Sequence, residues 1–175
     1  MEIIAQIFGI LAVVAFMLSF QFKKRSNIII VNVLSRALYI LQYVMLGAFE
    51  GAVLDFMGAI SSVIAKYKEK PFVRKYCTLI LIFMNLLLTL IGLALYENIF
   101  SLFAIGGIIL ETTALWITNE ASIRKLSAVA APFWLIYNLA NSAYGSAAGN
   151  IFAIISIGIA IYRYDRKKGG TNLNV

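Results

Sequence analysis

The sequence predicts an all-α protein that crosses a membrane several times. Of its 175 residues, 62% are apolar and only 13% are charged, and the mean hydropathy is +0.89. A chain of this composition cannot cover one water-exposed globule with polar side chains. Stretches such as 28–31 and 79–84 are apolar without alternation, which excludes the strands of a membrane β-barrel and favours helices surrounded by lipid and by other helices.

Seven stretches are candidates for membrane-crossing helices, each of which needs about 20 predominantly apolar residues. They are expected at 3–22, 28–47, 49–65, 77–95, 99–118, 126–144 and 147–162. The first stretch is not expected to be a cleaved secretory signal, because Glu2 precedes it and the basic run 23–25 follows it. We therefore expect one membrane domain built from all seven stretches.

The basic residues predict the orientation of these stretches. Apart from Arg36, they form four groups, at 23–25, 66–75, 124–125 and 163–168. Every group follows an odd-numbered stretch, so the positive-inside rule places the N-terminus outside and the C-terminus, with a tail at 165–175, in the cytoplasm of a bacterial cell. Such loops attract anionic lipid at the cytoplasmic face and account for the net charge of +7 without a nucleic-acid partner.

A pattern of tyrosine, leucine and two glycines indicates an internal duplication. It comprises Tyr39, Leu41, Gly47 and Gly51, and then Tyr137, Leu139, Gly145 and Gly149, at an offset of 98 residues. Both sets of three stretches begin outside, so we expect two parallel three-helix repeats at 3–66 and 99–164, joined by a linker helix at 77–95. This 3+1+3 arrangement is typical of transporters with parallel repeats.

The architecture and the Tyr-x-Leu-x5-Gly-x3-Gly turns resemble the SWEET and PQ-loop superfamily of small-solute carriers. Within it the chain is most similar to the bacterial inner membrane protein YgjV family, through Ala5-Gln6-x-x-Gly9, Leu46-Gly47 and Pro132-x-Trp134-x-x-Tyr137-Asn138. The resemblance implies a carrier of a small polar metabolite that works by alternating access. SWEETs place a tryptophan on the sixth helix and an asparagine on the seventh in the solute cavity, and Trp134 and Asn150 resemble that pair.

Apart from Glu50, the second residue of the third stretch, three charged residues lie inside the predicted stretches. Arg36 is eight residues into the second stretch, about 12 Å along the helix axis, and Glu111 and Asp55 are its candidate partners. A charge inside the membrane costs at least about 3 kcal/mol unless it is paired or faces water. The pair either holds the two halves together or lines the solute path, where Arg36 would bind an anionic or hydroxyl group. The offset of 98 aligns Arg36 with Trp134.

The sixth stretch carries an aromatic and two amides on one helical face. Trp134, Asn138 and Asn141 are spaced i, i+4 and i+7, and would stack on and hydrogen-bond a solute; the alternative is hydrogen bonding between helices. Asn150 is a further solute ligand or a helix cap. Pro132 is either a hinge or a static kink. Trp116, near a predicted inner loop, is expected to lie in the interfacial aromatic belt.

No residue pattern indicates enzyme chemistry. The chain has no histidine and a single cysteine, Cys77, and it lacks the common catalytic, phosphate-binding and metal-binding motifs. We therefore expect no enzyme activity, cofactor or metal. A carrier is the leading function and is compatible with a homo-oligomer; a membrane partner or sensor without transport activity is the alternative.

Overall fold

The computed structural model describes residues 2–165, which are helical throughout apart from short connections. The eight helices of this part are α1 (Glu2–Ser19), α2 (Arg25–Leu46), α3 (Phe49–Lys66), α4 (Pro71–Lys75), α5 (Cys77–Ala94), α6 (Ser101–Trp116), α7 (Glu120–Ala140) and α8 (Tyr144–Tyr164). The predicted all-α class is confirmed. Most of the predicted tail, residues 166–175, lies outside the described residues.

Each predicted stretch corresponds to one long helix, and the largest differences concern α4 and α7. The short α4 was not predicted; it starts with Pro71, whose missing N–H costs nothing at the first helical position. α7 begins at Glu120 instead of 126, because the Asn119 side chain accepts a hydrogen bond from the Ser122 N–H at 3.1 Å and caps the helix. It ends at Ala140, before the predicted end at 144.

Four of the described helices, α1, α2, α5 and α8, are long and apolar enough to cross a membrane by themselves. α6 is apolar but has only 16 residues. α3 contains Glu50, Asp55 and Lys66, and α7 begins with a charged segment, 120–125. The sequence-based expectation of seven spans therefore depends, for these three helices, on the partners that their polar side chains find inside the bundle.

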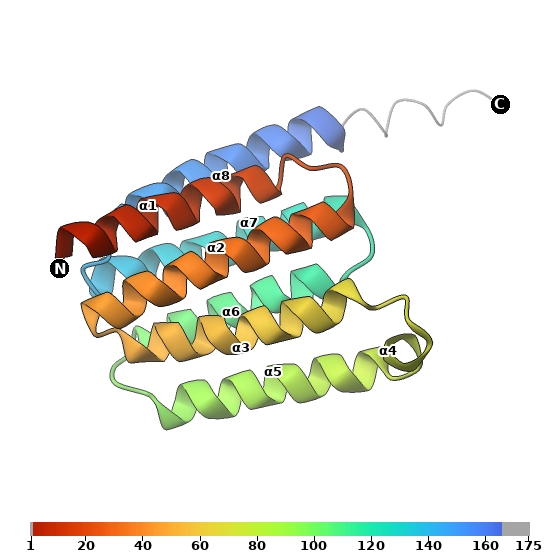
Figure 1. Cartoon of the computed structure of the whole chain (residues 1–175), viewed down its shortest axis with the longest axis horizontal. Coiled ribbons are helices and arrows are strands. Elements are labelled where there is room, and N and C mark those ends of the chain that lie inside the picture. Colours follow the sequence, from red (N-terminus) through yellow and green to blue (C-terminus); the bar gives the residue numbers. More distant parts are fainter. Residues whose placement is uncertain (1, 166–175) are drawn as a thin grey trace.

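Six helices form a closed ring (Figure 1). Going round it, α1 packs on α2, α2 on α3, α3 on α6, α6 on α7, α7 on α8, and α8 on α1 again. α5 packs outside the ring against α3 and α6, where Asn85 Nδ2 donates to Thr113 Oγ1 at 3.0 Å. Most of α5 is exposed, with Leu79, Ile82 and Phe83 each more than half exposed, as suits a helix in contact with lipid.

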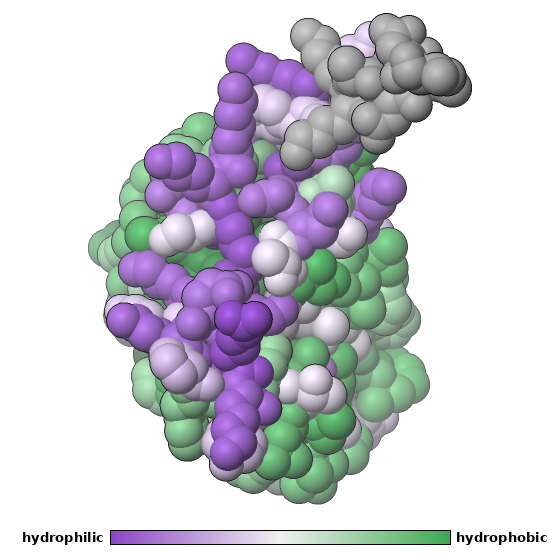
Figure 2. Space-filling model, turned by 90° about the vertical axis from the view of Figure 1, so that its right-hand side faces the viewer, coloured by the Kyte–Doolittle hydropathy of each residue, from purple (hydrophilic) through white to green (hydrophobic). Residues whose placement is uncertain are grey.

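Hydrophilic residues gather at one end of the bundle. α3 ends at Lys66, α4 carries Arg74 and Lys75, and the short connection 20–24 leads into α2 at Arg25. Figure 2 looks onto this end and shows a hydrophilic band between apolar flanks. We call it the basic end. The charge asymmetry that the sequence predicted is thus present in the folded chain.

The two halves of the ring repeat at an offset of 95 residues, not 98. α2 and α3 begin at Arg25 and Phe49, and α7 and α8 begin 95 residues later, at Glu120 and Tyr144. Every buried residue of α2 has a buried counterpart in α7 at this offset, for example Arg36 with Ala131 and Tyr43 with Asn138. α1 and α6 run in the same direction, as do α2 and α7 and α3 and α8 (Figure 1).

The turns that follow α2 and α7 show why the glycine pattern gave the wrong register. The Ala48 N–H donates to the Tyr43 carbonyl at 2.9 Å, and 95 residues later the Ala143 N–H donates to the Asn138 carbonyl at 2.9 Å. The left-handed residue that closes the first turn is Gly47, with φ 77°; Ser142, with φ 56°, lies at the matching position in the second. Gly145 is instead in the first turn of α8. The predicted alignment of Gly47 with Gly145 is therefore wrong, because the two glycines serve different purposes.

Candidate functional site

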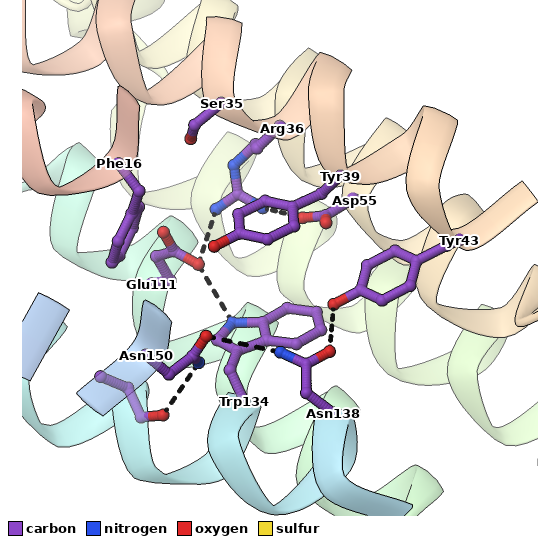
Figure 3. Close-up of a pocket in the computed structure, with 11 residues that line it drawn as sticks. Phe16, Ser35, Arg36, Tyr39, Tyr43, Asp55, Glu111, Trp134, Asn138 and Asn150 are labelled. Atoms are coloured by element: carbon purple, nitrogen blue, oxygen red, sulfur yellow. Dashed lines mark hydrogen bonds and ion pairs between the residues drawn. The ribbon is translucent and has the colours of Figure 1, made fainter. Parts of the chain in front are cut away.

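A small polar cavity lies inside the ring, and all six ring helices contribute to its wall (Figure 3). Its lining consists of Phe16 from α1, Ser35, Arg36, Tyr39 and Tyr43 from α2, Asp55 from α3, Glu111 from α6, Ala131, Trp134 and Asn138 from α7, and Asn150 from α8. Its volume is about 20 Å³, which is enough for roughly one water molecule.

Arg36 lies between two carboxylates. Its Nη1 is 2.7 Å from Asp55 Oδ1 and its Nη2 is 3.2 Å from Glu111 Oε2, so it joins both partners that the sequence suggested. Nε donates to Asn32 Oδ1, one turn earlier on α2, at 3.1 Å. The arginine is 1% exposed. Gly58 makes room for it, since a Cβ there would lie 2.7 Å from Nη1.

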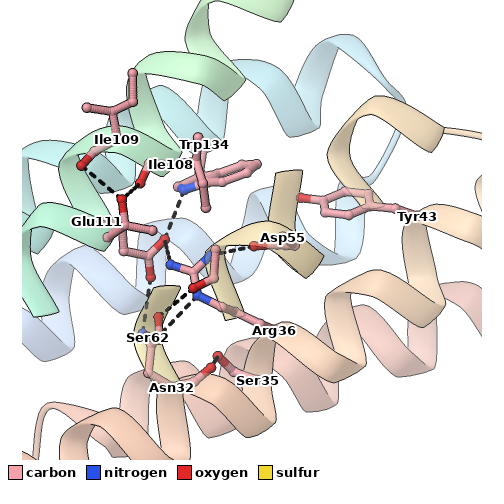
Figure 4. Close-up of polar contacts among 12 residues, drawn as sticks. Asn32, Ser35, Arg36, Tyr43, Asp55, Ser62, Ile108, Ile109, Glu111 and Trp134 are labelled. Atoms are coloured by element: carbon pink, nitrogen blue, oxygen red, sulfur yellow. Dashed lines mark hydrogen bonds and ion pairs between the residues drawn. The ribbon is translucent and has the colours of Figure 1, made fainter. Parts of the chain in front are cut away.

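Glu111 connects three helices (Figure 4). Besides facing Arg36, it accepts hydrogen bonds from Asn32 Nδ2 on α2 and from Trp134 Nε1 on α7, both at 3.1 Å. Two neutral donors and one cation therefore surround this carboxylate. Gly107 lets the indole approach α6, because a Cβ at this glycine would lie 3.1 Å from Trp134 Nε1.

Aromatic rings and amides form the remaining wall of the cavity. The Tyr43 hydroxyl donates to Asn138 Oδ1 at 2.7 Å, and the rings of Tyr39 and Tyr43 stack with centroids 6.1 Å apart. Asn138 Nδ2 donates to Asn150 Oδ1 at 3.5 Å in one orientation of the Asn150 amide. In the other, Asn150 donates to the Ser146 carbonyl at 2.6 Å and accepts from the Leu135 N–H at 3.2 Å. The swapped orientation pairs both amide atoms with backbone groups and is the better-satisfied one.

The lining is arranged in pairs that follow the internal repeat. At the offset of 95 residues, the paired positions are Phe16 with Glu111, Arg36 with Ala131, Tyr39 with Trp134, Tyr43 with Asn138, and Asp55 with Asn150. Equivalent positions of both halves thus face one cavity. The predicted equivalence of Arg36 and Trp134 is replaced by that of Tyr39 and Trp134, two aromatic residues. The three charged residues have uncharged counterparts, so the charge of the cavity is asymmetric.

Polar contacts close the basic end of the ring. Arg25, at the start of α2, donates to the carbonyls of Ala65, Leu115 and Ile117 at 2.9, 2.6 and 2.9 Å, and so ties α2 to the ends of α3 and α6. Near the start of α7, Arg124 pairs with Asp165 just after α8. The contacts of Arg25 satisfy carbonyls at the C-termini of α3 and α6, where positive charge is favoured.

Other contacts close the opposite end. The Gly145 N–H donates to Gln6 Oε1 at 3.0 Å, which ties α8 to α1. Ser146 Oγ donates to Gln42 Oε1 and ties α8 to α2. Ser101 Oγ donates to Glu50 Oε2 at 2.9 Å and ties α6 to α3. These contacts therefore tie neighbouring helices of the ring together at the end opposite the basic end.

The structure brings together most of the residues that the sequence singled out. Arg36, Asp55, Glu111, Trp134, Asn138 and Asn150 all line the cavity. Pro132 does not: it is exposed, beside Ala131, and α7 continues through it.

Two residues are placed differently from the expectation. Asn141 lies beyond the last turn of α7 and its side chain donates to the Tyr137 carbonyl at 3.0 Å, so it does not share the cavity face. Trp116 is 2% exposed and donates to Ser61 Oγ at 3.0 Å, so it is a core residue and not part of an interfacial belt.

Asn32, Tyr39 and Tyr43 are site residues that the sequence analysis did not identify. They lie at i−4, i+3 and i+7 from Arg36 and therefore on the same helical face. This spacing is the signal that would have identified them.

Comparisons with known proteins agree with a membrane protein. A family model described as a bacterial inner membrane protein, Imp-YgjV, matches residues 3–168. No curated protein and no solved structure gives a match. The four long apolar helices fit a protein that crosses the inner membrane several times. Since the matched segment covers nearly all of the sequence, the chain belongs to the Imp-YgjV family of bacterial inner membrane proteins.

Proposed function

We propose that this protein is a carrier of a small polar solute, with seven membrane-crossing helices in a 3+1+3 arrangement similar to that of SWEETs. The observation that carries the proposal is the polar cavity, to which equivalent positions of both repeats contribute. Carriers built from repeats bind their solutes at such interfaces near the middle of the membrane. Buried ionisable residues inside a membrane bundle are also typical of solute and ion paths.

Trp134, Asn138 and Asn150 would contact the solute in this proposal. The indole offers an aromatic face, and the two amides offer hydrogen-bond donors and acceptors. Arg36 Nη2 faces Glu111 at 3.2 Å without a well-directed hydrogen bond, so this N–H remains available for a solute. Arg36 is otherwise held by carboxylates, and its main contribution is to hold Asp55 and Glu111 in place.

Transport requires that the contacts at the two ends break alternately. In this proposal the cavity expands when one three-helix repeat rotates against the other, with Pro132 in α7 as the hinge. The basic end faces the cytoplasm and its anionic lipids in this proposal, which places the N-terminus outside. The chain is not an enzyme in this account, and the cavity is its functional centre.

A membrane partner or sensor without transport activity is the second candidate. The observation in its favour is the cavity volume of about 20 Å³, which is far below that of a typical small-molecule site of about 300–1,000 Å³. A sensor needs the buried polar network but no continuous path through the membrane. The two candidates therefore differ in whether the cavity opens to take up a solute.

A thermal-shift screen of small polar metabolites on the purified protein tests binding at the cavity. The matched variants are Asn138→Ala, in the cavity, and Asn85→Ala, at the contact of α5 with α6. We expect a compound that raises the Tm of the wild type and of Asn85→Ala but not that of Asn138→Ala. Equal shifts in both variants would exclude binding at this cavity, and the absence of any shift would favour the sensor.

A further inference from the structure

The charges around the cavity do not balance. Arg36 brings one positive charge, and Asp55 and Glu111 bring two negative charges when both are ionised. All three residues are at most 5% exposed. An isolated ionised carboxylate in such surroundings costs so much free energy that it is neutralised instead. The cavity therefore requires one further positive charge.

Within residues 2–165, no other charged side chain faces Asp55 from the helices packed against α3. α2 contributes Arg36 and the neutral Tyr39 and Tyr43, and α6 contributes Glu111. α5 has one titratable residue, Cys77, at its first position near the basic end. No helix terminus compensates the charge either, because Asp55 and Glu111 lie well inside α3 and α6.

We propose that Asp55 binds a proton and that this site couples proton uptake to the carrier cycle. Both carboxylate oxygens of Glu111 already accept a hydrogen bond, Oε1 from Asn32 and Oε2 from Trp134. Within residues 2–165, Asp55 accepts one hydrogen bond, from Arg36 to Oδ1. Its second oxygen is free to bind a proton, and the residue lines the cavity.

The size of the cavity suits the uptake of a proton through a single water molecule. A volume of about 20 Å³ admits roughly one water, which would deliver the proton to Asp55 from whichever side the bundle opens. An O–H bond of the hydrated proton that this water relays breaks as one O–H bond forms on the carboxylate, so the site gains one positive charge. Arg36 Nη2 is buried without a hydrogen-bond acceptor. A small polar molecule in the cavity would supply that acceptor.

The coupling rests on the proposed carrier function, but the proton site itself does not. When the basic end opens, Asp55 would exchange its proton with the cytoplasm; when the opposite end opens, it would exchange with the other side. Each complete cycle would then move protons together with the solute. Asn150, the repeat counterpart of Asp55, carries no charge, so the second repeat supplies no carboxyl group at the equivalent position of the cavity.

Infrared spectroscopy of the purified protein without any solute tests the proton site. We expect the C=O stretching band of a protonated carboxyl group at neutral pH, which Asp55→Asn abolishes. Glu111→Gln should abolish it too, because Arg36 and Asp55 then form a neutral pair and the proton is released. The control Glu97→Gln, at an exposed position near the opposite end, should keep the band. A wild type without the band, or a band that persists in both cavity variants, would overturn the proposal.

Tryptophan fluorescence gives a second readout. The chain has two tryptophans, so Trp116→Phe leaves Trp134, which donates to Glu111, as the only emitter beside the cavity. We expect its emission to titrate with pH in this background and to lose the transition when Asp55→Asn is added. A transition that Asp55→Asn leaves unchanged would contradict the proposal. If sodium changed the emission at constant pH, the positive charge that the cavity requires would come from a metal cation. That result would also reject the proton site.

These measurements separate the two proposals. A protonated Asp55 in a protein that moves no solute would retain the proton site and reject the carrier. Solute flux that does not change with pH, in a protein without the carboxyl band, would retain the carrier and reject the proton site.

Discussion

Arg36 is the residue on which the buried network most depends. It touches Asp55 on α3, Glu111 on α6 and Asn32 on its own helix. Removing a buried cation leaves its carboxylates uncompensated, which costs about 3–5 kcal/mol. We therefore expect Arg36→Gln to lower the Tm of the purified protein strongly, and the neutral triple variant Arg36→Gln, Asp55→Asn, Glu111→Gln to recover most of the loss.

The matched control is Arg74→Gln, on the exposed short helix α4, which should leave the Tm unchanged. An Arg36→Gln protein as stable as Arg74→Gln would show that the ion pairs contribute nothing to the fold. If the Tm of the triple variant were no higher than that of Arg36→Gln alone, the arginine would stabilise the fold by its shape and not by its charge.

Sequence reasoning identified the charged residues because a charge in an apolar stretch is costly wherever it faces lipid. Tyr39 and Tyr43 carry no such penalty, so only their position relative to Arg36 could have indicated their place in the cavity. Trp116 was misplaced because distance from a loop does not determine burial. Its indole is held by Ser61, 55 residues away in sequence, and that contact depends on the packing of α6 against α3.

The contact between α1 and α8 depends on a glycine. A Cβ at Gly149 would lie 2.2 Å from Val13 Cγ2 and 2.5 Å from Val13 Cβ, and a β-branched side chain has little freedom to move away. We expect Gly149→Ala to destabilise the bundle by about 1–3 kcal/mol through overpacking. The double variant Gly149→Ala, Val13→Ala should recover stability, because it removes the clashing methyl groups.

Gly158 on the same helix is the control, since a Cβ there meets nothing within 4 Å. Gly158→Ala should leave the Tm unchanged or raise it slightly, because alanine favours helix. Thermal unfolding in one detergent compares the variants. Equal effects at the two glycines would mean that α1 and α8 do not pack as closely as the structure shows.

At the level of helices, the apolar stretches predicted where each long helix lies, and failed on the register of the repeat. Residue identity aligned Gly47 with Gly145, whereas the helix starts and the buried faces align at 95 residues. Burial is set by which face of a helix meets its neighbours, and a single sequence does not state this. The start of α7 was missed for a different reason: the Asn119 cap makes the charged segment 120–125 helical.

For the whole molecule, the basic end predicts the orientation in the membrane. Cys77, the only cysteine of the chain, begins α5 directly after the basic helix α4. If the basic end is cytoplasmic, a membrane-impermeant maleimide should label Cys77 in permeabilised cells and not in intact cells. As a control, Glu97→Cys in a Cys77→Ser background, at the opposite end, should be labelled in intact cells. The reverse pattern would invert the topology.

The closed ring could not be predicted from the sequence. The contacts of α1 with α8 and of α3 with α6 join segments far apart in the chain, and it is these contacts that create one cavity instead of two separate three-helix units. Under the 95-residue repeat they are equivalent, since α1 corresponds to α6 and α8 to α3. An approximate twofold relation therefore connects the two halves of the ring, and equivalent positions of both halves line the cavity.

Solute flux in proteoliposomes tests the central claim, that this cavity is a solute site of a carrier, most directly. The solute is the compound found in the thermal-shift screen, and the variants compared are Trp134→Ala, in the cavity, and Trp116→Ala, in the core away from it. We predict flux for the wild type and for folded Trp116→Ala, and none for folded Trp134→Ala, because the loss of the indole removes stacking on the solute and the hydrogen bond to Glu111. Full flux through Trp134→Ala would contradict the account.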